Sequence, residues 1–358
     1  MSSKKGLVVG GGGARGAWAV GALWYLMKDR DERYDMVVGT STGSLIAPMA
    51  AIGDIEHLKE NYLNITWGEA LGTWIPTRSE TLNGIWALLT GKDSIYTSKP
   101  LHDSILNKHL TPDHWARLQD PHQSADVWVC TVDIRTGEKR YFGARDPGMT
   151  REKFASAMMA SCSIPVLMSK ARVIGEPDWF LDGGVKEMVP LDHIVQNGAS
   201  EVRIISMGVD PLVDCGEYPH LLDVALRTAE LAEEETSAND LALGRLISLE
   251  LDWRDRLRSR LSRKFSAAEV EACFSETSAE REPLMSAAGP YRRVTFRVLS
   301  PRCCIGPTHK FNPTIMAQYF ADGYKFASAR DEMTGAPEVN WRVIPEPLQG
   351  PEINRPVR

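Results

Sequence analysis

The chain has 358 residues and a formal net charge of −6, and hydrophobic and charged residues make up 43% and 25% of it. These proportions are typical of a folded globular protein and exclude wholesale disorder. The net negative charge provides no basic field for nucleic acid, so we expect no nucleic-acid partner. The length is enough for one large α/β domain or two ordinary ones.

The N-terminus and the cysteines together predict a cytoplasmic protein. The first residues lead directly into an apolar strand, without the longer apolar segment and cleavage site of a secretory signal. No uninterrupted apolar run is long enough to cross a bilayer. The cysteines lack metal-ligand spacing, which predicts reduced thiols and no metal site. They are Cys130, Cys162, Cys215, Cys273, Cys303 and Cys304.

The N-terminal part of the chain alternates between strand and helix patterns. Residues 6–9 and 35–38 are short apolar runs typical of buried strands, and residues 17–28 and 44–51 have helical patterns. A strand–helix–strand–helix order at this spacing predicts a parallel sheet with helices on both faces. The expected fold class is therefore α/β.

Further strands and helices follow along the chain. Residues 126–133 and 139–142 are separated by a turn and predict an antiparallel pair of strands. Residues 338–358 are rich in proline and predict an extended tail. The other expected strands are residues 178–181, 202–207 and 291–299, and the other expected helices are residues 55–66, 101–110, 151–161, 221–265 and 314–330.

Two stretches between these elements allow two interpretations each. In residues 67–90, Trp67, Trp74 and Trp86 are interleaved with glycines. This pattern predicts either a small helical subdomain with a tryptophan-rich core or a cap over the active site that meets a lipid surface. The basic run from Arg254 to Lys264 is either a solvated helix face or a contact with anionic phospholipid.

The strongest chemical signal is the Gly-x-Ser-x-Gly sequence of residues 39–43, directly after the second strand. Between a strand and a helix, this sequence is typical of a nucleophile elbow, in which the serine backbone is strained. Gly39 and Gly43 provide the space that such a turn needs. Ser41 is therefore the candidate nucleophile, beside the N-terminus of a helix whose amides can stabilise an oxyanion.

The glycine-rich loop after the first strand is the candidate oxyanion hole. Its backbone amides can approach a negatively charged oxygen closely because few side chains intervene. Arg15 is expected either to fix the loop or to steer an anionic head group. The residues of the loop are Gly11, Gly12, Gly13, Ala14, Arg15 and Gly16.

The same loop also matches the Gly-x-Gly-x-x-Gly pattern of dinucleotide-binding folds, between a strand and a helix. A dinucleotide site also needs an acidic residue at the end of the second strand, where it holds the ribose. Asp35 instead lies at the start of that strand. Cofactor binding is therefore the weaker alternative.

Asp182 is the candidate base, since it follows the predicted strand 178–181 and precedes two glycines. A serine hydroxyl is a weak nucleophile until a base takes its proton. An ordinary carboxylate is a weak base, so we expect apolar surroundings for Asp182. His193, His220 and His309 follow Asp182, in the order of a Ser–Asp–His triad. None of them lies in a glycine-flanked loop, so a Ser–Asp dyad is favoured.

In this order, the glycine loop with its arginine, the Gly-x-Ser-x-Gly and the Asp-Gly-Gly of residues 182–184 resemble the patatin-like phospholipase family, which carries G-G-G-x-R/K-G, G-x-S-x-G and D-G-G/A. Residues 160–165 resemble its A-S-x-A-x-P segment, with Ser163 where alanine is usual. Ser44 stands where glycine or alanine is usual. The resemblance covers about residues 6–208.

The resemblance implies a three-layer α/β/α sandwich with a mainly parallel central sheet. It implies that Ser41 is the nucleophile, that Asp182 is the base, and that the amides of Gly12, Gly13 and Ala14 bind the oxyanion. Phospholipids or lysophospholipids are the implied substrates, with peripheral contact to a membrane and without a cofactor. The expected function is thus hydrolysis of fatty acyl esters.

The expected organisation is a single domain over residues 1–335. It carries a tryptophan-rich helical insertion at about 60–125 and a polar helical insertion at about 215–290, neither of which resembles the family. Residues 336–358 form the expected tail. Two other functions stay open. One is a dinucleotide-binding oxidoreductase that uses the Gly11–Gly16 loop, and the other is a catalytically silent module that docks on membranes.

Overall fold

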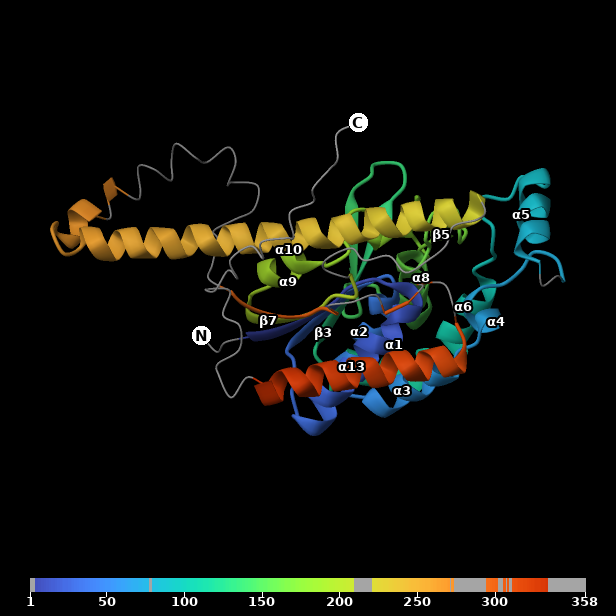
Figure 1. The fold of residues 1–358 in the computed structure, drawn as a ribbon, viewed down its shortest axis with the longest axis horizontal. Coiled ribbons are helices and arrows are strands. Elements are labelled where there is room, and N and C mark those ends of the chain that lie inside the picture. The colour runs from blue at the N-terminus through green and yellow to red at the C-terminus, as the bar shows by residue number, and fades with distance from the viewer. Residues whose placement is uncertain are drawn as a thin grey trace, which may run out of the picture.

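The fold is built around one mixed, mainly parallel sheet, seen in a computed structural model (Figure 1). Among the described residues, eight strands form this sheet in the order β5-β6-β3-β2-β1-β7-β8, and β4 also pairs with β3. The expected α/β class is therefore confirmed. The structure describes residues 4–76, 79–208, 221–270, 272–273, 294–301, 305–306, 308 and 311–333.

The parallel strands lie at the centre and the antiparallel strands lie beyond β3. The parallel strands are β1 (Lys4–Val9), β2 (Met36–Thr40), β3 (Asp126–Asp133), β7 (Ala199–Ile205) and β8 (Thr295–Leu299). The antiparallel strands are β4 (Lys139–Gly143), β5 (Ala171–Arg172) and β6 (Trp179–Asp182). All of β2 and the last four residues of β1 are buried, as expected for strands covered on both faces.

Alternate residues of the central strands enter two apolar cores. Leu7 and Val9 belong to the larger core, whereas Val8 and Val38 belong to a smaller core on the opposite face. Figure 1 shows the two helical layers: α1, α2, α3 and α13 lie on one side of the sheet, and α9 and α10 lie on the other. The three layers thus follow from the period of two in the strands.

The helices of the larger layer surround the first strands. They are α1 (Gly16–Trp24), α2 (Thr42–Ile52), α3 (Ile55–Asn64), α7 (Pro112–Gln119), α8 (Arg151–Ser161) and α13 (Pro313–Met333). A Cβ atom on Gly323 would lie 1.9 Å from the Trp18 carbonyl oxygen, so a glycine is needed where α13 crosses α1. This crossing brings the last expected helix against the first.

The remaining helices lie at the edges or across the other face. They are α4 (Trp67–Ala70), α5 (Glu80–Leu89), α6 (Lys99–Ser104), α9 (Leu191–Gln196) and α10 (Leu221–Leu261). Short irregular helices are η1 (Gly13–Arg15), η2 (Tyr25–Asp29), η3 (Ile105–His109) and η4 (Gly183–Val185). The expected helices 17–28 and 101–110 therefore each change to a wider π-type turn in their second half.

Several expectations fall on residues outside the described part of the chain. They are the tail 336–358, parts of the insertion 215–290, His220, His309, Cys215, Cys303 and Cys304. Cys130 and Cys162 are buried and reduced. Among the helices that the structure describes, none combines the length and the apolar character needed to span a bilayer.

Candidate functional site

Ser41 occupies the tight turn between β2 and α2. Its φ of 53° and ψ of −128° place it in a backbone conformation that residues other than glycine rarely adopt. Its amide donates to Ser161 Oγ at 2.9 Å, and its carbonyl accepts from the Ser44 amide at 2.8 Å. These bonds hold the strained backbone in place, as expected for a nucleophile elbow.

The two glycines of the elbow are explained by close backbone contacts. A Cβ atom on Gly39 would lie 2.1 Å from the Gly43 carbonyl oxygen, and one on Gly43 would lie 2.1 Å from the Val9 carbonyl oxygen. Both distances are far below van der Waals contact. The turn can therefore form only where both residues lack a side chain.

Asp182 ends β6, and its carboxylate is buried with 1% of the residue exposed. Its Oδ1 accepts from the Gly184 amide at 2.7 Å. Among the described residues, Oδ2 has no partner in hydrogen-bond geometry. Burial raises the pKa of Asp182 to about 7, and the Ser41 hydroxyl and the Gly184 amide oppose this rise. The structure thus brings the Ser41 hydroxyl close enough to Asp182 to lower the pKa of its carboxyl.

The apolar surroundings expected for Asp182 come only partly from its sequence neighbours. Phe180 is buried, but Trp179 is 37% exposed and points away from the core. Met188 contributes instead, since a Cβ atom on Gly184 would lie 2.5 Å from its Cε and 3.1 Å from Asp182 Oδ1. The sequence indicated a buried carboxylate but not which side chains bury it.

The glycine loop reaches Ser41 through Gly11. A Cβ atom on Gly11 would lie 3.0 Å from Ser41 Cβ and 2.3 Å from Met188 Sδ. Several amides of the loop are already bonded within the protein. Gly11 donates to Met188, Ala14 donates to the Thr308 carbonyl at 2.7 Å, Arg15 donates to Gly12, and Gly16 donates to Gly13 and Ala14. The amides of Gly12 and Gly13 have no acceptor among the described residues.

Arg15 is buried and connects the loop to distant parts of the chain. Its Nε donates to the Gly306 carbonyl at 2.8 Å, and its guanidinium pairs with Glu234 of α10 at 3.2 Å. Only 5% of Arg15 is exposed. Of the two roles expected for Arg15, the geometry fits fixing the loop rather than steering a head group.

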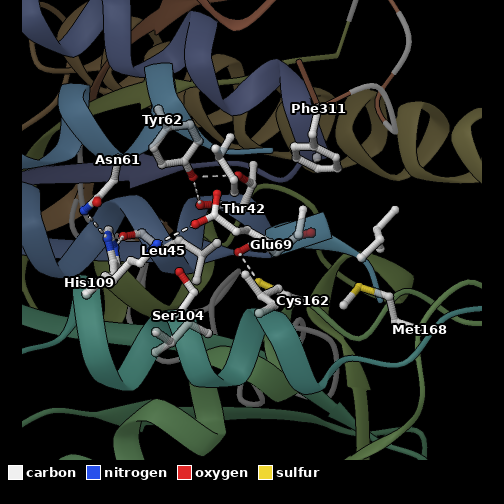
Figure 2. A pocket seen from close by; sticks show the side chains of 18 of the residues that line it. Thr42, Leu45, Asn61, Tyr62, Glu69, Ser104, His109, Cys162, Met168 and Phe311 are labelled. Atoms are coloured by element: carbon white, nitrogen blue, oxygen red, sulfur yellow. Dashed lines mark hydrogen bonds and ion pairs between the residues drawn. The ribbon is translucent and has the colours of Figure 1, made fainter. Parts of the chain in front are cut away.

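Ser41 lies at the wall of a cavity of about 370 Å³ (Figure 2). Part of the lining is apolar and comes from the loop after α8 and from helices α2, α6 and η3. These residues are Leu45, Leu101, Ile105, Ile164, Leu167 and Met168. Phe311, from the loop before α13, also lines the cavity, and Cys162 Sγ donates to the Ser41 carbonyl oxygen at 3.2 Å. An apolar chain can therefore lie in the cavity with its ester at Ser41.

The cavity is also lined by polar residues, which were not predicted from the sequence. Asn61 bonds the rings of His57 and His109 at 2.8 and 3.2 Å, and His109 Nε2 bonds the Leu45 carbonyl oxygen. Burial lowers the pKa of His109 to about 4, so its imidazole is neutral at physiological pH. Both ring nitrogens of His109 are engaged, which leaves it unable to act on Ser41. The nearest sequence signal was the polar character of residues 55–66.

His193 lies away from the site. Its ring stacks on Tyr141 with a centroid distance of 3.9 Å and contacts Trp128 at 5.1 Å. Burial lowers its pKa to about 4. This placement agrees with the preference for a dyad over a Ser–Asp–His triad that uses His193.

Comparison with known proteins found similar solved structures and a matching family model. Two solved structures are similar over most of the chain. VipD from Legionella pneumophila is 15% identical with a TM-score of 0.43, and the match covers 93% of this chain and 67% of that one. Full-length ExoU from the type III secretion system of Pseudomonas aeruginosa, solved with SpcU, is 14% identical with a TM-score of 0.29, and the match covers 95% of this chain and 72% of that one.

The family model of the patatin-like phospholipases matches residues 7–195. The match runs from β1 into α9 and includes the glycine loop, the elbow and Asp182. Because it spans more than half of the sequence, the chain belongs to the patatin-like phospholipase family, which implies lipid acyl hydrolase activity.

Proposed function

We propose that the chain hydrolyses fatty acyl esters of phospholipids or lysophospholipids through a Ser41–Asp182 dyad. Asp182 takes the hydroxyl proton while Ser41 Oγ bonds to the ester carbonyl carbon. The ester bond to the alcohol then breaks, and the alcohol leaves with the proton from Asp182. Asp182 next takes a proton from water, whose oxygen bonds to the acyl carbon of the acyl-enzyme. The bond between the acyl carbon and Ser41 Oγ then breaks, Asp182 returns the proton to Oγ, and the fatty acid leaves.

The proposed oxyanion donors are the amides of Gly12 and Gly13. The amide of Ala14 is not a proposed donor, because it already donates to the Thr308 carbonyl oxygen. The amide of Thr42 is a further candidate, since it is the first residue of α2 and the first amides of a helix have no partner within the helix. Such donors stabilise the negative charge that develops on the carbonyl oxygen.

The single observation that carries the proposal is the state of Asp182. Its Oδ2 is buried without a hydrogen-bond partner among the described residues, and its pKa is raised to about 7 beside the Ser41 hydroxyl. A carboxylate with a pKa near neutrality is a much better base than an ordinary one. The apolar cavity beside Ser41 supports an acyl chain as the substrate.

The dinucleotide alternative has less support. Thr308 contributes a carbonyl oxygen to the glycine loop, and a Cβ atom on Gly13 would lie 2.3 Å from that oxygen. A pyrophosphate would need this space. We also propose a cytoplasmic location, since the six cysteines are scattered along the sequence.

The test is the hydrolysis of p-nitrophenyl butyrate, together with mass spectrometry of the products from mixed phospholipids. We expect Ser41→Ala and Asp182→Asn each to lower kcat/KM by about 10³-fold or more. Ser262→Ala and Asp178→Asn are matched controls, because both residues lie outside the site. Full activity in either dyad variant would exclude the mechanism.

A further inference from the structure

Helix α5 presents an apolar face to solvent. Leu82, Ile85, Leu88 and Leu89 are 57%, 51%, 81% and 80% exposed. We call these four residues the α5 surface. Their spacing places them along one side of a ten-residue helix, at the end of the molecule that Figure 1 shows beyond α6. A contiguous exposed apolar face of this kind indicates a binding surface.

The helix is firmly attached to the rest of the protein. Asn83 is completely buried, donates to the Ile95 carbonyl at 2.6 Å and accepts from the Trp74 amide at 2.8 Å. Ser79 caps the helix at the Leu82 amide. The α5 surface is therefore presented in one orientation.

Basic side chains lie over indole rings beside this helix. Lys92 Nζ lies 4.6 Å from the ring centre of Trp74 and 5.8 Å from that of Trp86. Lys170 and Arg172 lie 5.0 and 4.6 Å from the ring centre of Trp179. Lys170 also pairs with Asp93, in the segment that follows α5, at 2.9 Å.

The segment that follows α5 is also hydrogen-bonded to residues beside the cavity. The amides of Ile95 and Tyr96 donate to the carbonyls of Val166 and Leu167 at 2.9 and 2.8 Å. Val166 is 62% exposed, whereas Leu167 and Met168 line the cavity beside Ser41. Exposed Val166 is therefore next in sequence to residues that line the cavity.

We propose that the α5 surface binds a phospholipid bilayer. In this arrangement the four apolar side chains enter the interface, the tryptophans lie at head-group depth, and Lys92, Lys170 and Arg172 face lipid phosphates. Lipid then reaches the cavity past Val166. Only this last step rests on the proposed function, since binding itself needs no catalysis.

A bilayer fits these features better than a protein does. The α5 surface belongs to one short helix, whereas a stable protein interface buries roughly 1,200–2,000 Å² in total. Lysine is also depleted at the centre of protein interfaces, but lysine beside tryptophan is favoured at the edge of a bilayer. The basic run at residues 254–264, considered above for membrane contact, lies towards the opposite end of the molecule (Figure 1).

The experiment is flotation with phosphatidylcholine vesicles, with and without phosphatidylserine, using Ser41→Ala protein so that no lipid is consumed. We expect Leu88→Ser/Leu89→Ser to weaken binding to both vesicles about tenfold or more, because apolar burial is lost. Lys92→Ala/Lys170→Ala weakens binding chiefly to the vesicles with phosphatidylserine. Trp253→Ser/Phe265→Ser is the matched control, since these residues flank the basic run of residues 254–264, which we call the basic region, and are 58% and 52% exposed.

The outcomes separate this proposal from its alternatives. On the wild-type background, Leu88→Ser/Leu89→Ser should retain hydrolysis of p-nitrophenyl butyrate, which shows that the site is intact. Unchanged vesicle binding in that variant would overturn the proposal, and loss of binding in the Trp253→Ser/Phe265→Ser control would assign binding to the basic region. A dimer of the parent protein that dissociates on the Leu88→Ser/Leu89→Ser change would identify a second copy as the occupant.

Discussion

At the scale of single residues, Ser41 and Asp182 are both held in unfavourable states by their neighbours. Ser41 has a positive φ, and Asp182 has a buried carboxylate oxygen without a partner among the described residues. Such states occur where surrounding structure compensates for them, and they concentrate at functional sites. Both states have measurable consequences for activity and stability.

The first prediction concerns the pH dependence of activity. Asp182 must be ionised to take the proton of Ser41, and its pKa is about 7. We therefore expect kcat/KM for a soluble ester to rise about tenfold per pH unit below that pKa and to level off above it. A profile that is flat from about pH 5 to pH 8 would contradict the role of Asp182 as the base.

The second prediction concerns stability. Because burial raises the pKa of Asp182 from 3.8 to about 7, the folded protein binds this proton more tightly than the unfolded chain. Stability from this group is present at low pH and is lost as pH rises between the two pKa values. Asp182→Asn should therefore raise the free energy of unfolding at pH 8 by about 1–4 kcal/mol. In urea titrations this gain should shrink towards pH 4, and an equal gain at both pH values would exclude the titration of Asp182 as its cause.

At the scale of elements, α10 contacts residues of the site although it lies outside the family motifs in sequence. Its Glu234 pairs with Arg15 of the glycine loop, and its Asp240 accepts from the Val189 amide at 2.9 Å. Glu234 also pairs with Arg227 at 3.4 Å. The loop that we propose as the oxyanion hole is therefore positioned by a helix more than 200 residues further along the chain.

The third prediction tests this connection. Glu234→Gln leaves the buried guanidinium of Arg15 without its carboxylate, which should cost about 2–4 kcal/mol of stability. It should also lower kcat more than it changes KM, because the loop amides act on the transition state. Arg15→Met/Glu234→Leu should recover part of the stability, and Glu235→Gln, at an exposed neighbour, should change neither quantity. Urea unfolding measures the change in stability, and steady-state kinetics measure kcat and KM. Unaltered kinetics in Glu234→Gln would contradict the role of α10 in positioning the loop.

The fourth prediction concerns the elbow. Gly43→Ala would place a methyl group 2.1 Å from the Val9 carbonyl oxygen, so the strand and helix must separate. We expect a loss of about 3 kcal/mol or more, or a failure to fold. Gly84→Ala in α5 is the control, since no atom lies within 4 Å of its added Cβ. That control should be neutral or more stable by up to about 1 kcal/mol in thermal unfolding, and equal effects of the two changes would refute the steric argument.

At the scale of the whole molecule, the cavity combines segments that are far apart in the chain. Leu45 of α2, Leu101 of α6, Leu167 after α8 and Phe311 before α13 all line it. Its polar wall comes from α3 and η3. The specificity of the proposed enzyme is therefore a property of the assembled fold and not of any one motif.

The fifth prediction follows from the apolar lining. With p-nitrophenyl esters of increasing length, kcat/KM should rise by up to about fourfold per methylene until the cavity is filled, because each buried methylene contributes about 0.8 kcal/mol. Leu167→Trp should shift the preferred ester to a shorter chain. Ile134→Trp, at a position that is 48% exposed outside the cavity, is the control. Equal rates along the series would show that the acyl chain does not occupy this cavity.

The sequence was most informative where function depends on local geometry. The order of strand and helix patterns predicted the parallel sheet, and closely spaced glycines predicted the turn at Ser41. Both predictions depend on residues that are near one another in the chain. The assignment of residues 1–335 to one domain with two insertions stays a prediction.

Only the tertiary structure decided which groups surround the site. It assigned the burial of Asp182 to Met188 as well as to the sheet, gave Ala14 an acceptor in Thr308, and tied Arg15 to Glu234. It also left the α5 surface exposed, which the tryptophan pattern alone could not distinguish from a core. The reason is physical: burial and hydrogen-bond pairing depend on segments that are distant in sequence, and local periodicity carries no information about how those segments meet.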